Sequence, residues 1–337
     1  MPDLLTATEG RAGRITLNRP KALNALTHQM CLDIEATLDA WANDPAIELI
    51  LIDASGDRAF CAGGDIAKMY ETGMAGDYSY GRQFWQDEYR LNAKIAHYSK
   101  PIVSFLQGFT MGGGVGIGCH ASHRIVGETS QIAMPEVSIG LVPDVGGSLL
   151  LAHAPGQLGA YLGVTAARMD AGNAIYAGFA DHFIPEESWP ALKSTLAERG
   201  VEALASHPAP APSLANDADS LKDIFATSNL PEVAERAQGT DIAKRLARHS
   251  PLAMACALKI IERLTDTRDI TEALNLEYRF TARSMEHGDF LEGIRAQIID
   301  KDKNPAWRHD PHTLQDSDVD QMLAPLGAEE LNLEEPA

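Results

Sequence analysis

Short apolar runs with the composition of buried strands recur along the chain, and helical patterns lie between them. Examples are IELILID (47–53), KPIVSFLQG (100–108) and SQIAMPE (130–136), and alternating residues over 4–18 predict a hairpin in front of them. Strand-rich units with intervening helices favour a layered α/β fold or a coil of β-β-α units. The units barely resemble one another in sequence, so the repeat that we predict is one of structure.

The length of the chain predicts more than one structural part. Its 337 residues exceed the size of a usual single core, and typical domain sizes predict about two domains. The proline-rich stretch HPAPAPS (207–213) is the best boundary, because the pattern beyond it is helical. We therefore expect an α/β core over residues 1–206, a helical C-terminal region over residues 207–310, and an acidic, partly mobile tail over residues 311–337.

The charge balance limits the classes of partner. Acidic residues outnumber basic ones by 47 to 28, and the formal net charge is -19. This charge repels nucleic acid and anionic membranes, so neither is an expected partner. No apolar run reaches membrane-spanning length, and the N-terminus lacks a secretory or transit pattern. Four cysteines without C-x-x-C spacing are typical of reduced, buried thiols, and we expect a cytoplasmic protein.

Two glycine clusters, CAGGD (61–65) and MGGGVG (111–116), each follow a predicted strand. Glycine exposes backbone N–H groups without side-chain obstruction, and a helix that begins nearby favours negative charge. Two such N–H groups that face one point would form an oxyanion hole. The alternative is that these glycines only permit tight turns or close helix packing.

Three other types of site receive weak support. Gly116, Gly118 and Ala121 satisfy the dinucleotide-binding pattern G-x-G-x-x-[GA], but the glycine run begins earlier than such a turn requires. His120 and His123 could bind a metal, yet no acidic or cysteine set with metal spacing accompanies them. No G-x-S-x-G elbow supplies a serine nucleophile. We expect no metal site.

Two acids, Glu136 and Asp144, lie in the otherwise apolar run IAMPEVSIGLVPDVGG. Pro135, Gly140 and Pro143 exclude a straight helix between them, and a loop can bring them together. Apolar surroundings raise the pKa of a carboxyl group, and two neighbouring carboxyls separate into a proton donor and a base or nucleophile. Exposed acids or helix caps are the alternative interpretation.

Several motifs together resemble the crotonase, or enoyl-CoA hydratase/isomerase, superfamily. They are NRPKALNAL (18–26), AFCAGGDI (59–66), TMGGGVGIG (110–118) and AMPEVSIGLVPDVGG (133–147). With DEYRLN and EGIRAQIIDKDKNPAW added, the pattern is similar to the 3-hydroxyisobutyryl-CoA hydrolase branch. The resemblance covers about residues 14–310, is weakest from 190 to 250 and, as a set of motifs, is highly specific. It implies a crotonase-like superhelix of β-β-α turns with a C-terminal helical region.

The resemblance also implies roles for individual residues. The oxyanion-hole amides fall on Gly64 and Gly113, and the acid that most of the superfamily carries falls on Glu136. Asp144 matches an additional acid of the hydrolase branch, and Glu88 matches a glutamate that binds the substrate. By this comparison Glu136 attacks the thioester carbonyl or activates water, Asp144 protonates the departing thiolate or steers water, and Glu88 holds the 3-hydroxyl group.

One departure bears on the reaction. Hydratases of the superfamily carry a second glutamate three positions after the oxyanion glycine, and this chain has Gly116 there. The resemblance therefore implies hydrolysis of a short-chain 3-hydroxyacyl-CoA, foremost 3-hydroxyisobutyryl-CoA of valine breakdown. A double-bond hydratase or isomerase and a non-catalytic acyl-CoA-binding protein are the alternatives. Coenzyme A is then part of the substrate, no separate cofactor is expected, and a homo-oligomer is compatible with the family.

Overall fold

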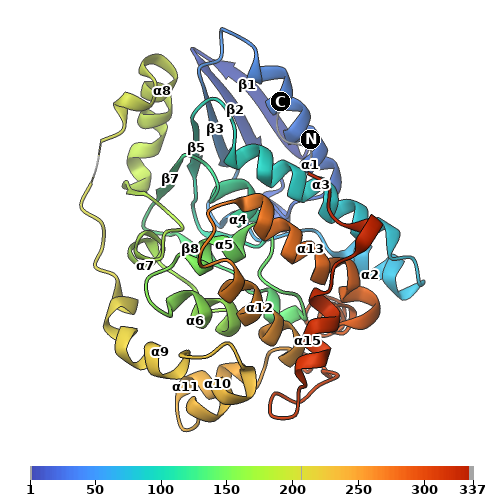
Figure 1. Ribbon diagram of the computed structural model, residues 1–337. Coiled ribbons are helices and arrows are strands. Elements are labelled where there is room, and N and C mark those ends of the chain that lie inside the picture. The colour runs from blue at the N-terminus through green and yellow to red at the C-terminus, as the bar shows by residue number, and fades with distance from the viewer. Residues whose placement is uncertain (1, 206, 334–337) are drawn as a thin grey trace.

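Two β-sheets form the strand framework of the structure, a computed structural model that describes residues 2–205 and 207–333. The larger sheet lies in the upper part of Figure 1, and helices lie below it. The larger sheet has the order β1-β2-β3-β5-β7-β9 and the smaller one β4-β6-β8. β1 runs antiparallel to β2, and the other neighbours are parallel. The strands are β1 (Leu4–Glu9), β2 (Ala12–Leu17), β3 (Leu49–Ala54), β4 (Ala59–Cys61), β5 (Ile102–Phe105), β6 (Phe109–Met111), β7 (His123–Val126), β8 (Gln131–Ala133) and β9 (His182–Phe183).

Helices connect and cover the sheets. None in the described part of the chain is long and apolar enough to cross a membrane. They are α1 (His28–Ala42), α2 (Ala67–Met74), α3 (Ser79–Ala96), α4 (Gly113–Gly118), α5 (Gly147–Ala152), α6 (Leu158–Thr165), α7 (Ala171–Tyr176), α8 (Trp189–Arg199), α9 (Ala218–Ile224), α10 (Leu230–Arg236), α11 (Asp241–Leu246), α12 (Pro251–Arg263), α13 (Ile270–His287), α14 (Phe290–Ile294) and α15 (Asp316–Leu323).

Successive turns of the chain add one strand to each sheet. β3 is followed by β4, β5 by β6, and β7 by β8, and further chain returns to the larger sheet for the next turn. Parallel strands need such crossover connections, because a tight turn can join only antiparallel strands. The structure therefore confirms the α/β class and the predicted coil of β-β-α units.

Both faces of the larger sheet are covered, which explains why its central strands are almost continuously apolar. On one face, Leu51 and Phe105 belong to a buried cluster with Trp189 of α8. Ile52 points to the opposite face and belongs to the main core, together with Ile34 of α1. Side chains that alternate along a strand thus fill two separate cores.

The C-terminal helices pack against the helical side of the core, with α12 beside α6 and α13 beside α3 (Figure 1). Phe290 of α14 contacts Trp85 of α3, with ring centroids 5.6 Å apart. Residues 311–333 also pack on the protein, since Glu330 forms an ion pair with Arg279 and Leu331 is buried. Of the tail that we expected to be partly mobile, residues 311–337, the last four residues (334–337) lie outside the described residues. The division into parts at 206 and 310 stays a prediction.

Candidate active site

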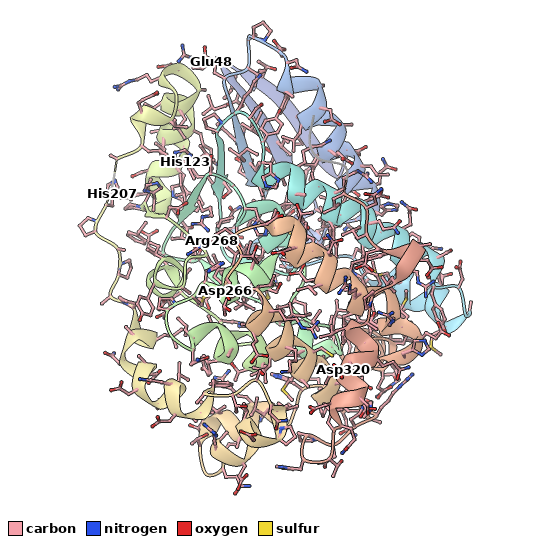
Figure 2. All side chains as sticks on the ribbon, viewed as in Figure 1. Glu48, His123, His207, Asp266, Arg268 and Asp320 are labelled. Carbon is pink, nitrogen blue, oxygen red and sulfur yellow. The ribbon has the colours of Figure 1, made fainter. Side chains whose placement is uncertain are left out.

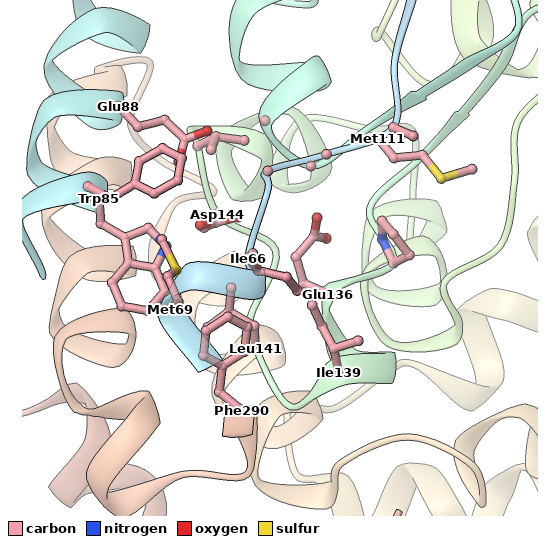
Figure 3. A pocket seen from close by; sticks show the side chains of 18 of the residues that line it. Ile66, Met69, Trp85, Glu88, Met111, Glu136, Ile139, Leu141, Asp144 and Phe290 are labelled. Carbon is pink, nitrogen blue, oxygen red and sulfur yellow. The ribbon is translucent and has the colours of Figure 1, made fainter. Parts of the chain in front are cut away.

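A cavity of about 240 Å³ lies beside the two glycine-rich bends. The loops after β4, β6 and β8 line it, together with α2, α3 and α14. All five candidate residues from the sequence meet there, namely Gly64, Glu88, Gly113, Glu136 and Asp144. Figure 3 shows the three acids around one space although they come from different segments of the chain.

The two predicted oxyanion glycines lie close together. Gly64 follows β4, and Gly113 is the first residue of α4, directly after β6. A Cβ atom added to Gly113 would lie 3.6 Å from the Gly64 nitrogen. Neither amide donates a hydrogen bond to another described residue. The first N–H groups of a helix have no partner within it, so this pair can bind an oxygen atom that gains negative charge.

Glycine is needed here for space as well as for the backbone. Gly63 and Gly112 have φ angles of 111° and 49°, a region that other residues rarely adopt. A Cβ atom at Gly112 would lie 2.9 Å from Glu136 Oε1, and one at Gly113 would lie 2.7 Å from Glu88 Oε1. The tight turns and the predicted oxyanion hole are therefore two consequences of the same glycines, because side chains there would displace the acids.

Glu136 and Asp144 are brought together by an irregular loop, as expected from its prolines and glycines. Glu136 begins a 3-10 turn, and the chain then reverses at Gly140, whose φ angle is 75°. The two side chains are only 5% and 4% exposed. Glu136 Oε2 has no hydrogen-bond partner among the described residues, whereas Asp144 Oδ2 accepts a hydrogen bond of 2.9 Å from the Tyr89 hydroxyl. The pair is therefore neither exposed nor used as helix caps.

Glu88 approaches the same cavity from α3. It is 4% exposed, and its Oε1 atom likewise lacks a partner within the described ranges. Trp85, one helical turn earlier, lines the cavity beside it (Figure 3). A carboxyl with an unused acceptor next to an apolar wall can bind a hydroxyl group on a short acyl chain.

Burial controls the protonation of these acids. It raises the pKa of Asp144 to about 7, although the Tyr89 hydrogen bond acts in the opposite direction. Burial, followed by the charge of Asp144, holds the pKa values of Glu136 and Glu88 well above the usual range. Neighbouring carboxyls cannot all ionise at neutral pH, so this site holds shared protons and can both donate and accept them.

Sequence reasoning missed two residues behind the site, Tyr89 and Glu277. Tyr89 is fully buried on α3 and reaches Asp144. Glu277 is fully buried on α13, on the same apolar face as Leu274 and Thr281. A carboxyl at core spacing on a helix is the one signal that could have found Glu277.

Gly116 lies within α4, behind the cavity. A Cβ atom there would lie 2.6 Å from Asn92 Nδ2 and 2.9 Å from the Val145 Cβ atom. Asn92 is fully buried, and its two amide atoms have no partner among the residues that the structure describes. No space is left at Gly116 for a glutamate side chain, so the absence of a second glutamate is built into the packing.

The alternative sites of the sequence analysis are not formed. Gly116 and Gly118 lie inside α4 and not in a turn that could hold a pyrophosphate. His120 bonds the Val145 carbonyl at 2.8 Å, whereas His123 lies on β7 (Figure 2). Within the described ranges, no group of histidine, cysteine and acidic residues could hold a metal ion. The four cysteines are buried and unpaired, as expected.

Comparisons with known proteins agree with this geometry. The family model for enoyl-CoA hydratase/isomerase matches residues 12–323. A Xenopus tropicalis protein named mitochondrial 3-hydroxyisobutyryl-CoA hydrolase is 36% identical over 98% of this chain and 91% of its own length. A structure titled enoyl-CoA hydratase, from Rhodobacter sphaeroides, has 55% identity, a TM-score of 0.95, and coverage of 98% and 100% of the two chains. A structure titled carnitinyl-CoA dehydratase, from Mycobacterium thermoresistibile, is 38% identical with a TM-score of 0.93. The match covers 98% of this chain and 99% of that one.

Proposed function

This chain belongs to the enoyl-CoA hydratase/isomerase family, and we propose that it hydrolyses the thioester of a short-chain 3-hydroxyacyl-CoA, foremost 3-hydroxyisobutyryl-CoA. The observation that carries the proposal is that two backbone amides, neither bonded to another described residue, meet two buried acids in one cavity. The curated relatives, which match over nearly their full length, support the same reaction. Valine degradation is the setting in which this substrate would arise.

The thioester carbonyl would bind between Gly64 N and Gly113 N. Its oxygen gains negative charge when a nucleophile attacks the carbonyl carbon, and two fixed N–H dipoles stabilise that charge. Burial from water strengthens this interaction. Because both amides belong to the backbone, one in the bend after β4 and one at the start of α4, they need no rearrangement when the charge develops.

Glu136 would act as the nucleophile or base of the reaction, and Asp144 as the acid. In the protonation state in which the shared proton lies on Asp144, the ionised Glu136 carboxylate attacks the carbonyl carbon to give an anhydride, or it takes a proton from an attacking water. The C–S bond breaks, and Asp144 gives its proton to the coenzyme A thiolate. In the anhydride route, water then cleaves the intermediate and restores both acids. The Asp144 pKa of about 7 keeps a proton available for this step near neutral pH.

Glu88 would select the acyl group. Its Oε1 atom, which has no partner in the described part of the chain, can accept a hydrogen bond from a 3-hydroxyl group. Trp85 and Met69 line the cavity around the acyl chain. An acyl chain without a hydroxyl would leave this buried oxygen unpaired, which costs binding free energy. Coenzyme A enters as part of the substrate, and a separate cofactor is not needed for this chemistry.

Hydration of a double bond is the second candidate, since the two solved relatives carry hydratase and dehydratase titles. The packing of Gly116 against Asn92 argues against it, because paired-glutamate water addition would lack one member. Cytoplasmic location and homo-oligomeric assembly stay predictions, and the names of the curated relatives place those proteins in mitochondria.

Release of free thiol tests the proposal directly. The full chain is incubated with 3-hydroxyisobutyryl-CoA, 3-hydroxypropionyl-CoA and an enoyl-CoA, and a thiol-trapping reagent reports free coenzyme A. Hydrolysis releases thiol from the 3-hydroxyacyl substrates. Consumption of the enoyl-CoA without thiol release would instead identify a hydratase or isomerase, and no turnover of any thioester would favour an acyl-CoA-binding protein.

A further inference from the structure

Glu277 connects the C-terminal helix α13 to the loop that carries Asp144. Its carboxylate accepts hydrogen bonds from Gly146 N at 2.8 Å, from Ser148 N at 3.2 Å and from the Ser148 hydroxyl. Gly146 is the N-cap residue of α5, so a side chain from a distant helix satisfies the unpaired N–H groups at the start of α5. Asp144 lies only two residues before that cap.

The backbone between Asp144 and α5 needs such support. Val145 and Gly146 both have left-handed conformations, with φ angles of 53° and 76°. A branched side chain rarely adopts this conformation unless the surrounding structure holds it there. His120 holds the Val145 carbonyl from one side at 2.8 Å, and Glu277 holds the next amide from the other.

The contact with Ser148 keeps Glu277 bound whether or not it carries a proton. Burial, opposed by these hydrogen bonds, raises the pKa of Glu277 to about 8, and the nearby charge of Asp144 adds to the increase. A hydroxyl group can donate to a carboxylate and accept from a carboxylic acid. The contact between Glu277 and Ser148 therefore persists when a reaction at the neighbouring acids changes the protonation of Glu277.

We propose that Glu277 is a positioning residue that holds the Asp144 carboxyl at the reaction centre through the start of α5. The proposal rests on the function proposed above for Asp144. It assigns a part in catalysis to α13, although no residue of this helix is among the described residues that line the cavity. It also explains why a carboxyl group is kept, fully buried, on the apolar face of that helix.

A double-substitution cycle tests the inference. Glu277→Gln cannot accept hydrogen bonds from both amides in the same way, so we expect kcat for coenzyme A release to fall about 10²-fold with little change in KM. In the Asp144→Asn background the same substitution should lower kcat by less than about threefold, because the carboxyl group that Glu277 positions is already replaced by an amide. An equal loss in both backgrounds would show a general structural role and overturn the proposal.

Two further variants test whether the position of the Glu277 carboxyl group matters, and whether the loss of any buried carboxyl group has the same effect. Glu277→Asp keeps a carboxyl group but is too short to bond both amides, and we expect a similar loss of kcat. Asp53→Asn removes another buried carboxyl, which lies on β3 and forms ion pairs with Arg14 of β2 and Lys193 of α8. It should lower kcat equally in both Asp144 backgrounds if it lowers kcat at all. Full activity of Glu277→Asp would contradict the positional argument.

Amide hydrogen exchange provides a readout that needs no turnover. In Glu277→Gln we expect faster exchange at Gly146 and Ser148, while Asp53→Asn leaves these two amides protected. Unchanged protection in Glu277→Gln would overturn the inference even if the enzyme were active. Faster exchange in a protein that releases no coenzyme A would support the contact of Glu277 with the start of α5 and reject the proposed hydrolysis. Failure of the inference and failure of the proposed function can therefore be distinguished.

Discussion

Glu136 is the residue on which the proposed chemistry depends most. A buried carboxylate oxygen without a partner costs stability, and such groups persist mainly where function requires them. We predict that Glu136→Gln lowers kcat for coenzyme A release by at least about 10³-fold, because a neutral amide is neither nucleophile nor base. Thioester binding, measured by calorimetry, should change only a few-fold. Turnover close to that of the original chain would exclude this role for Glu136.

Tyr89 should set the pH at which Asp144 loses its proton. The hydroxyl donates to the Asp144 carboxylate and so lowers the pKa of Asp144, which burial has raised to about 7. Tyr89→Phe removes this stabilisation of the ionised form, and the pKa of Asp144 rises. The alkaline limb of the kcat profile, measured from about pH 5 to 9, should therefore move up by about one pH unit. A shift to lower pH would mean that Asp144 acts in its ionised form or is not the group observed.

At the level of elements, the strands and glycine bends were predictable because their signals are local. An apolar run gives β3, and a glycine cluster after a strand gives the start of α4. Tyr89 and Glu277 were not found because their partners lie 55 or more positions away in the sequence. Their role follows from the packing of α3 and α13 against the loop, which no local pattern specifies.

The start of α4 should be intolerant of even one methyl group. Gly113→Ala places a Cβ atom 2.7 Å from Glu88 Oε1, so either the acid or the helix must shift. We predict a loss of about 10²-fold in kcat/KM for coenzyme A release, with the fold retained by circular dichroism. Gly178→Ala is the control, because that glycine has a φ angle of 81° and an added Cβ atom would have no described neighbour within 4 Å. It should cost about 1 kcal/mol of stability and leave activity unchanged, and equal losses in the two variants would refute the argument.

For the whole molecule, the β-β-α coil was predictable, but the closure of the cavity by the C-terminal region was not. Phe290 of α14 and Ile298 of the following π-helical turn line the cavity, although they lie more than 140 residues from Asp144. The resemblance identified three acids that the structure brings to one cavity, because each has its own short motif. The apolar wall has no motif, since many combinations of side chains fill the same volume.

The buried acids should also control the stability of the whole protein. The folded-state pKa values of Asp144 and Glu277, about 7 and about 8, exceed the values of unfolded carboxyls near pH 4. The folded state therefore binds more protons than the unfolded state over this window. The stabilisation is complete below about pH 4 and is lost as the pH rises through the folded values. We predict that the free energy of unfolding, measured in urea, falls by at least about 1 kcal/mol from pH 5 to pH 8.

The net charge of -19 would produce a decrease of the same sign, because surface repulsion grows as the protein ionises. Salt separates the two causes, since it screens exposed charges but hardly affects buried ones. The decrease should therefore persist in about 0.5 M salt and become smaller in Glu277→Gln, which removes one of the titrating groups. A decrease that disappears in salt, or that is the same size in Glu277→Gln, would assign the pH dependence to the surface and not to the acids around the cavity.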